Sequence, residues 1–293
     1  MDTQDLAAFV AIVEGGSFST AALRLALTQS AVSRRIAALE NRLGARLFDR
    51  VGRSVALTEA GHALLPRARA VLAELDDART LIRNLGGAVT GPLRLGTSHH
   101  IGLHRLPPVL RRFSRAYPDV DLDLHFLDSE AARDLLLRGR LDLAVVTLSP
   151  GGFAELECTG VWEDPLSFAT GPDHPLARAK GLTLAQLAEQ PAVLPAPTTF
   201  TGRIVTGAFA ARGLTLGRRL ETNYLETVRM MANIGLGWTV LPKTMIDARL
   251  VPLDLDADPQ LQRTLGWMRH PGRTPTNATR AFLEVLASAA DPG

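Results

Sequence analysis

The chain has 293 residues, of which 46% are hydrophobic and 21% are charged, a composition typical of a globular protein with two or three domains. No stretch offers the roughly 18 continuous apolar residues of a membrane span, and the first residues are acidic where a signal peptide is basic. We therefore expect a cytoplasmic protein with no membrane contact. The one cysteine, Cys158, excludes an intramolecular disulfide and a cysteine-rich zinc module.

Charge is distributed unevenly along the chain. The formal net charge is +2, yet residues 18–53 carry seven arginines against Glu40 and Asp49, a local charge of +5. Residues 91–293 carry 21 basic and 21 acidic side chains, which cancel. Basic residues gathered in one short segment indicate a polyanionic partner there, although charge alone would fit a solvated basic surface equally well.

Two helices are predicted at the start of the chain. The first shows apolar residues spaced three and four apart at Leu6, Phe9, Val10 and Val13. Gly15 and Gly16 should end it, and Ser17 is a good cap for a short helix over 18–25.

A third helix should run from a Thr28 cap to about Leu43, with Gly44 as its end. One face is apolar at intervals of four, three and four, at Val32, Ile36, Leu39 and Leu43. The opposite face carries short or hydrogen-bonding side chains, at Gln29, Ser30, Ser33, Arg34 and Ala37. An ordinary surface helix would carry paired Glu and Lys, so this face suits close approach to a flat partner.

A small hairpin should follow, with strands at Leu47–Asp49 and Val55–Leu57, a turn around Gly52, and Arg50 and Arg53 at its tip. Two helices, a tight turn and a basic hairpin are typical of a winged helix-turn-helix. The major groove of B-DNA admits one helix, and there Gln pairs with adenine edges and Arg with guanine. The polar face of the third helix therefore predicts binding to double-stranded DNA.

Residues from Thr58 to about Leu85 should form one long helix. Its apolar positions alternate spacings of four and three, at Leu64, Ala68, Val71, Leu75, Ala78, Ile82 and Leu85. Such a narrow seam favours packing along a second helix in a dimer, although packing against the chain's own body would give the same pattern. Pro66 should bend the helix in its first turns, and Gly86-Gly87 should end it.

From Pro92 onward, strand and helix patterns alternate, which indicates an α/β architecture with a parallel sheet. A first set has strands at 93–97, 121–127 and 141–147 and helices at 105–116 and 129–138. A second set has strands at 192–196 and 217–222 and helices at 202–212 and 224–234. A strand at 263–270 and a helix at 276–289 then return to the first set, so we expect two lobes.

The whole chain resembles the LysR-type transcriptional regulators. The stretch FSTAALRLALTQSAVSRRIAALENRLGARLFDR resembles the N-terminal signature of that family, and LTEAG and the heptad helix follow as they do in the family. In the second half, RLGTSHH, RGRLDLAVV and GLGWTVLP are similar to family segments at the same places.

The resemblance implies a multidomain α/β repressor or activator without a cofactor or metal. Its parts would be a winged helix-turn-helix DNA-binding domain at 1–58, a dimerising linker helix at 59–87 and an effector-binding domain at 88–293. That last domain would be similar to the type 2 periplasmic binding proteins, with lobe I at about 91–161 and 267–293 and lobe II at about 162–266. Implied partners are promoter DNA, a small effector, further copies of the chain in a homodimer or homotetramer, and RNA polymerase if the protein is an activator.

The resemblance also implies site residues, carried over by position. Base contacts in the groove would come from Gln29, Ser30, Ser33 and Arg34, and phosphate contacts from Thr28, Arg50, Arg53 and Thr58. The effector cleft would be lined by Ser98, His99, His100, Ser129, Thr147, Thr199, Phe200 and Thr201. The consecutive histidines depart from the family pattern, so the effector cannot be taken from a relative.

Three interpretations fit the histidines at 99, 100 and 104. One is effector binding, because they lie where a strand gives way to a helix N-terminus, which favours anions. Another is a metal site, because His100 and His104 share a helix face, with His125 or Asp128 as a third ligand in space. The third is structural, with the imidazoles bonded to neighbouring backbone groups.

The chemistry of the expected cleft favours an anion. It is rich in hydroxyl groups and holds no carboxylate except Asp128 nearby, so we expect a small carboxylate or oxyanion as the effector. A histidine that binds as imidazolium would make affinity fall as the pH rises through about 6.5. No nucleophile elbow, phosphate-binding glycine loop or zinc protease helix supports an enzyme. A secreted solute-binding protein would account for the second half alone.

Overall fold

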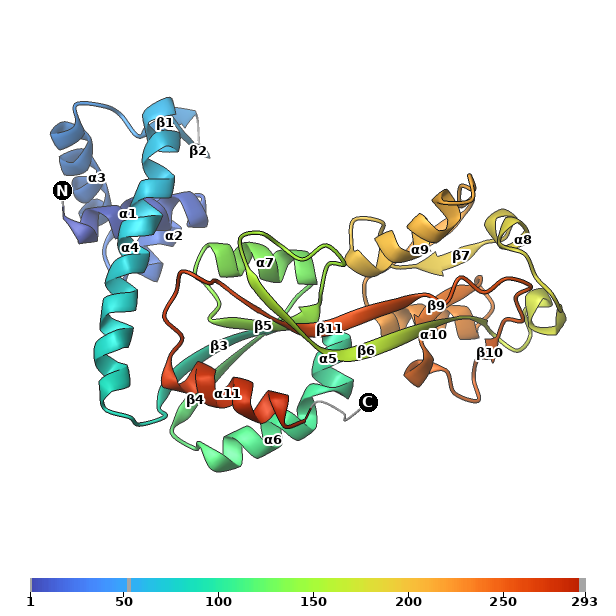
Figure 1. Ribbon diagram of the computed structural model, residues 1–293. Helices are drawn as coiled ribbons and strands as arrows, with labels where there is room; N and C mark the ends of the chain where they lie inside the picture. Colours follow the sequence, from blue (N-terminus) through green and yellow to red (C-terminus); the bar gives the residue numbers. More distant parts are fainter. Residues whose placement is uncertain (1, 52–53, 290–293) are drawn as a thin grey trace. The chain divides into compact units, whose positions relative to one another are not determined.

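The structure of the chain, a computed structural model, describes residues 2–51 and 54–289. These residues form two compact units, 1–86 and 87–293 (Figure 1). The first unit combines helices with one hairpin, and the second alternates strands with helices.

Three helices build the core of the N-terminal unit: α1 (Thr3–Gly15), α2 (Phe18–Arg24) and α3 (Gln29–Leu43). Their first turns are capped by the side chains of Asp2, Ser17 and Thr28, each of which accepts a backbone N–H. Gly16 and Gly44 follow α1 and α3 with φ of 68° and 64°, a left-handed conformation that glycine adopts without strain. These helices agree with the predicted ones to within a residue.

The apolar stripe predicted on α3 is buried except at its end. Val32, Ile36 and Leu39 lie in the core of the unit, but Leu43 is 43% exposed. Leu43 is the last residue of α3, where the helix extends past the packed core, so its place in the stripe does not bury it.

The hairpin consists of β1 (Phe48–Val51) and β2 (Ser54–Leu57), which pair antiparallel. Oε1 of Glu40, on α3, accepts the backbone N–H of Leu47 at 2.7 Å, which ties the hairpin to α3. The long helix α4 (Glu59–Leu85) contains Pro66 and starts directly against this hairpin. A Cβ atom at Gly61 would collide with the carbonyl oxygen of Leu47, so only glycine allows this approach.

The seam predicted along α4 is divided in the structure. Ala68 is 1% exposed and is therefore buried against the chain's own helices, and Leu64 is half-buried against the same core. The correction follows from packing, because this part of α4 lies on α1. The remaining seam residues are exposed in the unit, at Val71, Leu75, Ala78, Ile82 and Leu85.

A mixed sheet of seven strands runs through the C-terminal unit, in the order β10-β6-β11-β5-β3-β4, with β9 also paired to β6. The strands are β3 (Gly91–Thr97), β4 (Val120–Phe126), β5 (Leu143–Thr147), β6 (Glu157–Thr170), β9 (Thr239–Pro242), β10 (Val251–Pro252) and β11 (Gln262–Arg269). As predicted, β3 is parallel to β4 and β5, whereas β11 runs antiparallel to β5 and β6. A separate parallel pair is formed by β7 (Ala192–Leu194) and β8 (Arg219–Glu221).

Two lobes share the long strands β6 and β11 (Figure 1). Lobe I adds the helices α5 (His99–His104), α6 (Leu106–Ala116), α7 (Ser129–Leu137) and α11 (Asn277–Ala287). Lobe II adds α8 (Leu184–Glu189), α9 (Phe200–Ala210) and α10 (Leu225–Asn233), with 3-10 turns η1 (Pro175–Arg178) and η2 (Lys243–Met245). The sequence did not reveal β6, and the lobe limits expected near 161 and 266 fall inside these shared strands.

Within the described residues, no single helix is long and apolar enough to cross a membrane. The helices α1 and α2 reach the required length and apolar composition only when they are counted together, and they meet at 120°. Both contribute buried side chains to the core of the N-terminal unit.

Candidate functional site

The polar face of α3 faces solvent in the N-terminal unit. Gln29, Ser30 and Arg34 are exposed, and Ser33 is half-buried. Oε1 of Gln29 accepts the hydroxyl of Ser19 at 3.3 Å, which links this face to α2. Because the opposite stripe of α3 is fixed in the core, the polar residues are presented on a rigid helix.

The residues predicted to contact phosphate have different positions. Thr28 and Thr58 both cap helices, at the start of α3 and α4. The hydroxyl of Thr58 donates to the carbonyl of Arg46 at 2.6 Å and its backbone N–H donates to a second carbonyl, so both donors are engaged within the unit. Arg50 belongs to β1, but its side chain lies outside the described part of the chain, as does all of Arg53.

A cavity of about 50 Å³ lies between the two lobes of the C-terminal unit. All eight residues predicted for the effector cleft line it: Ser98, His99, His100, Ser129, Thr147, Thr199, Phe200 and Thr201. Six more residues complete the lining: Asp128, Glu130, Pro195, Asn223, Leu225 and Arg263. Segments that are far apart in sequence therefore meet at one place.

Several helices begin at this cavity. Ser98, Asp128 and Thr199 are the N-caps of α5, α7 and α9, and all three line it. A Cβ atom at Gly202 would collide with the carbonyl oxygen of Ala196, so the first turn of α9 packs directly on the loop that follows β7. Helix N-termini carry partial positive charge, which favours an anion at this position.

Two carboxylates line the cavity, whereas the sequence predicted only Asp128. Oδ2 of Asp128 accepts Nδ2 of Asn223 at 2.7 Å. Glu130 lies 3.3 Å from the guanidinium of Arg203, in the first turn of α9. Burial raises the pKa of Glu130, although the backbone N–H groups oppose the rise. A carboxylate of the chain itself therefore occupies the start of α9.

A buried ion pair that the sequence analysis missed also borders the cavity. Arg263, on β11, is 6% exposed, and its Nε donates to Oδ2 of Asp164 at 2.7 Å. Its Nη1 donates to the hydroxyl of Thr201 at 3.0 Å, while Nη2 has no hydrogen-bond partner among the described residues. The fully buried Asp164 also lies 3.6 Å from the guanidinium of Arg105. Burial lowers the pKa of Arg263, whereas the negative charge of Asp164 raises it. The guanidinium remains charged, as it does in proteins generally.

His100 is neutral in this environment. It is 6% exposed, and its Nε2 lies 4.0 Å from Oδ2 of Asp164. Burial, together with the nearby Arg263, His104 and Arg105, lowers the pKa of His100 to about 3. The pH dependence that an imidazolium would give therefore does not apply to His100. A neutral ring offers one N–H donor and one acceptor nitrogen, and neither has a partner in the described structure.

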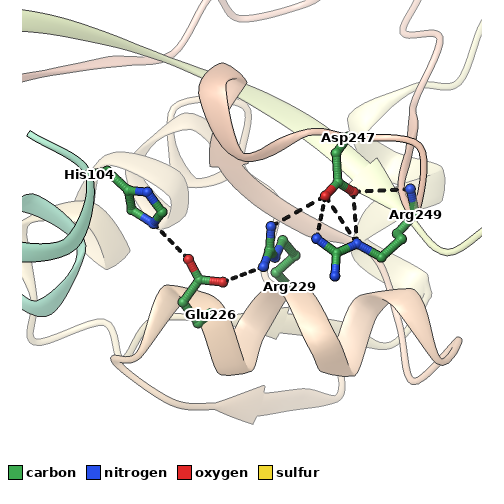
Figure 2. Close-up of polar contacts among 5 residues, drawn as sticks. All are labelled: His104, Glu226, Arg229, Asp247 and Arg249. Atoms are coloured by element: carbon green, nitrogen blue, oxygen red, sulfur yellow. Dashed lines mark hydrogen bonds and ion pairs between the residues drawn. The ribbon is translucent and has the colours of Figure 1, made fainter.

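The other two histidines form contacts between the lobes. His99 is exposed and packs against the ring of Tyr224 at 4.7 Å. Nε2 of His104 lies 2.7 Å from Glu226, which in turn pairs with Arg229 at 2.6 Å (Figure 2).

The same chain of contacts continues inside lobe II (Figure 2). Arg229 lies 3.4 Å from Asp247, and hydrogen bonds from Arg249 lower the pKa of Asp247 to about 2. His104 is therefore tied into a network of charged side chains and is not aimed at a ligand.

The metal interpretation gains no support from the geometry. The rings of His100 and His104 lie 5.0 Å apart, and Nε2 of His125 lies 3.1 Å from Asp123. Within residues 2–51 and 54–289, no group of three His, Cys, Asp or Glu side chains is placed to hold a metal ion.

Two family models match the chain. Residues 3–62 match the bacterial regulatory helix-turn-helix proteins of the lysR family, and residues 86–291 match the LysR substrate binding domain. The chain belongs to the LysR family of transcriptional regulators. It is thus a DNA-binding transcriptional regulator with a substrate-binding domain, and the family predicted from the sequence is confirmed.

Relatives of this LysR-family regulator share its full length. An uncharacterized HTH-type transcriptional regulator, YeiE from Escherichia coli K12, is 32% identical over 99% of this chain and 98% of that protein. The structure of a full-length OxyR variant from Pseudomonas aeruginosa is 25% identical, covers 99% of this chain and 97% of that chain, and has a TM-score of 0.71. CbnR in complex with its target DNA is 21% identical, covers 99% and 100% of the two chains with a TM-score of 0.63, and shows the shared fold.

Sequence reasoning missed the buried Arg263, Asp164 and Glu130 in this LysR-family regulator. In the strand RTLGWMR, Arg263 alternates in phase with Leu265, and both are buried. The alternation therefore places Arg263 on the same face of the strand as Leu265, and this was a sequence feature that could have indicated a buried charge. No such signal existed for Asp164, because β6 was not predicted.

Proposed function

We propose that this regulator binds promoter DNA with an affinity that depends on a small anion held in the cavity between the lobes. The observation that carries the proposal is the meeting of eight predicted residues, from both lobes, around one cavity where α7 and α9 begin. A ligand held by both lobes binds one arrangement of them best and so shifts their equilibrium. The shift would change how the DNA-binding units of an oligomer are presented to the operator.

Contacts to DNA are proposed for the exposed face of α3 and for the hairpin. Gln29, Ser30, Ser33 and Arg34 would read base edges in the major groove, and Thr28, Arg50 and Arg53 would contact phosphates. The local excess of arginine supports this assignment, as does the likeness to CbnR, which was solved with its target DNA. Thr58 is better explained as a cap, because its donors are engaged.

The assembly is proposed to form through the exposed part of α4. Ile82 is 71% exposed and Leu85 is 86% exposed, and such large apolar side chains gain from burial against a partner helix. A second contact between effector-binding domains would give a tetramer, and an activator of this kind would also contact RNA polymerase.

A mobility-shift measurement tests the function. The full-length chain should bind the promoter fragment beside its own gene at least about 1,000-fold more tightly than a scrambled fragment of the same length and composition. The two fragments carry the same phosphate charge, so the difference reports base recognition alone. Equal affinity for both fragments would contradict the proposal.

A further inference from the structure

We propose that Arg263 recognises the negative charge of the effector, a small anion. The inference rests on the proposed function, because it takes the cavity between the lobes as the effector site. It adds the residue that carries the charge recognition.

The first reason is the incomplete bonding of Arg263. Its guanidinium has five N–H donors, of which Nε serves Asp164 and Nη1 serves Thr201. Nη2 has no hydrogen-bond partner in the part of the chain that the structure describes, and the side chain is 4% exposed. A buried donor without a partner costs about 1–3 kcal/mol, and more when the group is charged. An anionic oxygen in the cavity would remove that cost.

The neighbours of Arg263 extend the same site. The hydroxyl oxygen of Thr201 accepts from Arg263, which leaves its proton available to donate. His100 lines the same cavity and has two ring nitrogens without partners among residues 2–51 and 54–289. Two buried side chains that have unsatisfied polar atoms, Arg263 and His100, thus line the same cavity.

The start of α9 is a poorer place for the anion than the sequence suggested. Glu130 is paired there with Arg203, and Thr199 accepts the N–H of Gly202 at 3.1 Å. The other cavity carboxylate, Asp128, accepts from Asn223. Arg263 is the arginine among the residues that line the cavity, and besides its bond to Asp164 it has the donors of Nη2 for an anion.

The cavity, of about 50 Å³, leaves room for a small ligand. Acetate and nitrate are therefore suitable anionic probes.

Calorimetry on the full-length chain tests the proposal with sodium acetate and sodium nitrate as probes, in a sodium gluconate background. Acetamide, which has the shape of acetate without its charge, is the ligand control. Wild type should bind at least one of the two anions saturably and should not bind acetamide. Arg263→Lys should weaken that binding at least about tenfold, because one ammonium cannot hold Asp164 and Thr201 and also face the ligand. Arg269→Lys, on the same strand but paired with Glu157, should bind as wild type does.

Thr201→Val provides a second variant that keeps the Arg263–Asp164 pair and tests the site even if Arg263→Lys does not fold. Thr201→Val should weaken binding of the same anion several-fold. The proposal is overturned if neither anion binds wild type, if acetamide binds as well as acetate, or if Arg263→Lys and Thr201→Val bind the anion unchanged. Promoter affinity with and without the bound anion is measured separately by mobility shift. An anion that still changes promoter affinity but binds Arg263→Lys and Thr201→Val unchanged would contradict this site and leave the proposed function standing.

Discussion

Replacement of His100 by glutamine should make the C-terminal unit less sensitive to acid. The pKa of His100 is lowered to about 3 in the folded chain, first by burial and then by the nearby arginines, whereas an unfolded chain keeps a value near 6.5. Between these values the unfolded state binds a proton that the folded state does not bind. Protonation of His100 therefore does not change the free energy of unfolding above pH 7, and it lowers that free energy as the pH falls below about 6.5.

The magnitude follows from the unfolded state. A pH of 5 lies about 1.5 units below the pKa of the imidazole in the unfolded chain. At 1.36 kcal/mol per unit, protonation of the unfolded state therefore favours unfolding by about 2 kcal/mol. This figure holds for any folded pKa well below 5, such as the value of about 3 for buried His100.

Denaturation with urea at pH 8 and at pH 5 would measure the effect. Trp162, Trp238 and Trp267 all belong to the C-terminal unit, so tryptophan fluorescence reports on that unit alone. From pH 8 to pH 5, wild type should lose about 2 kcal/mol more stability than His100→Gln. The other titrating groups are common to both proteins and cancel. Equal losses would show that folded His100 takes up a proton freely, which would refute the burial argument.

Other changes should separate the functional parts. Arg34→Ala should weaken specific operator binding by about 1–3 kcal/mol and relax the base preference at its position. Arg53→Ala should weaken binding to every sequence and reduce the salt dependence of binding. Identical losses on specific and random DNA in both variants would refute the assignment of base contacts to α3 and phosphate contacts to the hairpin. Leu75→Glu should reduce the oligomer seen by light scattering and lower operator affinity, and an unchanged mass with unchanged affinity would exclude the α4 interface. Ser98→Ala and His99→Ala should weaken anion binding as measured by calorimetry. Undiminished affinity in both variants would show that the effector site lies elsewhere.

Local patterns predicted most of the elements because their causes are local. The cap at Thr28, the left-handed Gly44 and the apolar spacing on α3 each act over a few residues, and all are present in the structure. Leu43 shows the limit of that reasoning, since periodicity gives the face of a helix but not where the core ends.

The candidate site was predicted only in part, because its charged centre depends on long-range packing. The polar residues after β3 and β4, at the end of β5 and at the start of α9 were accessible from the sequence, and they line the cavity. Arg263 and Asp164 meet across 99 residues through the pairing of β11 with β6. Nothing in the local sequence specifies that pairing. The alternation that indicates a buried Arg263 therefore does not show that Arg263 meets Asp164 beside the cavity.

The affinity of the full-length chain for its promoter fragment, measured by fluorescence anisotropy over increasing acetate or nitrate, tests the central claim most directly. Sodium gluconate should replace the probe anion so that the ionic strength stays constant, because DNA binding depends on the salt concentration. The account predicts that the dissociation constant changes at least about threefold, to a plateau, with the anion that calorimetry shows to bind. A dissociation constant that stays the same at every concentration of that anion would contradict it.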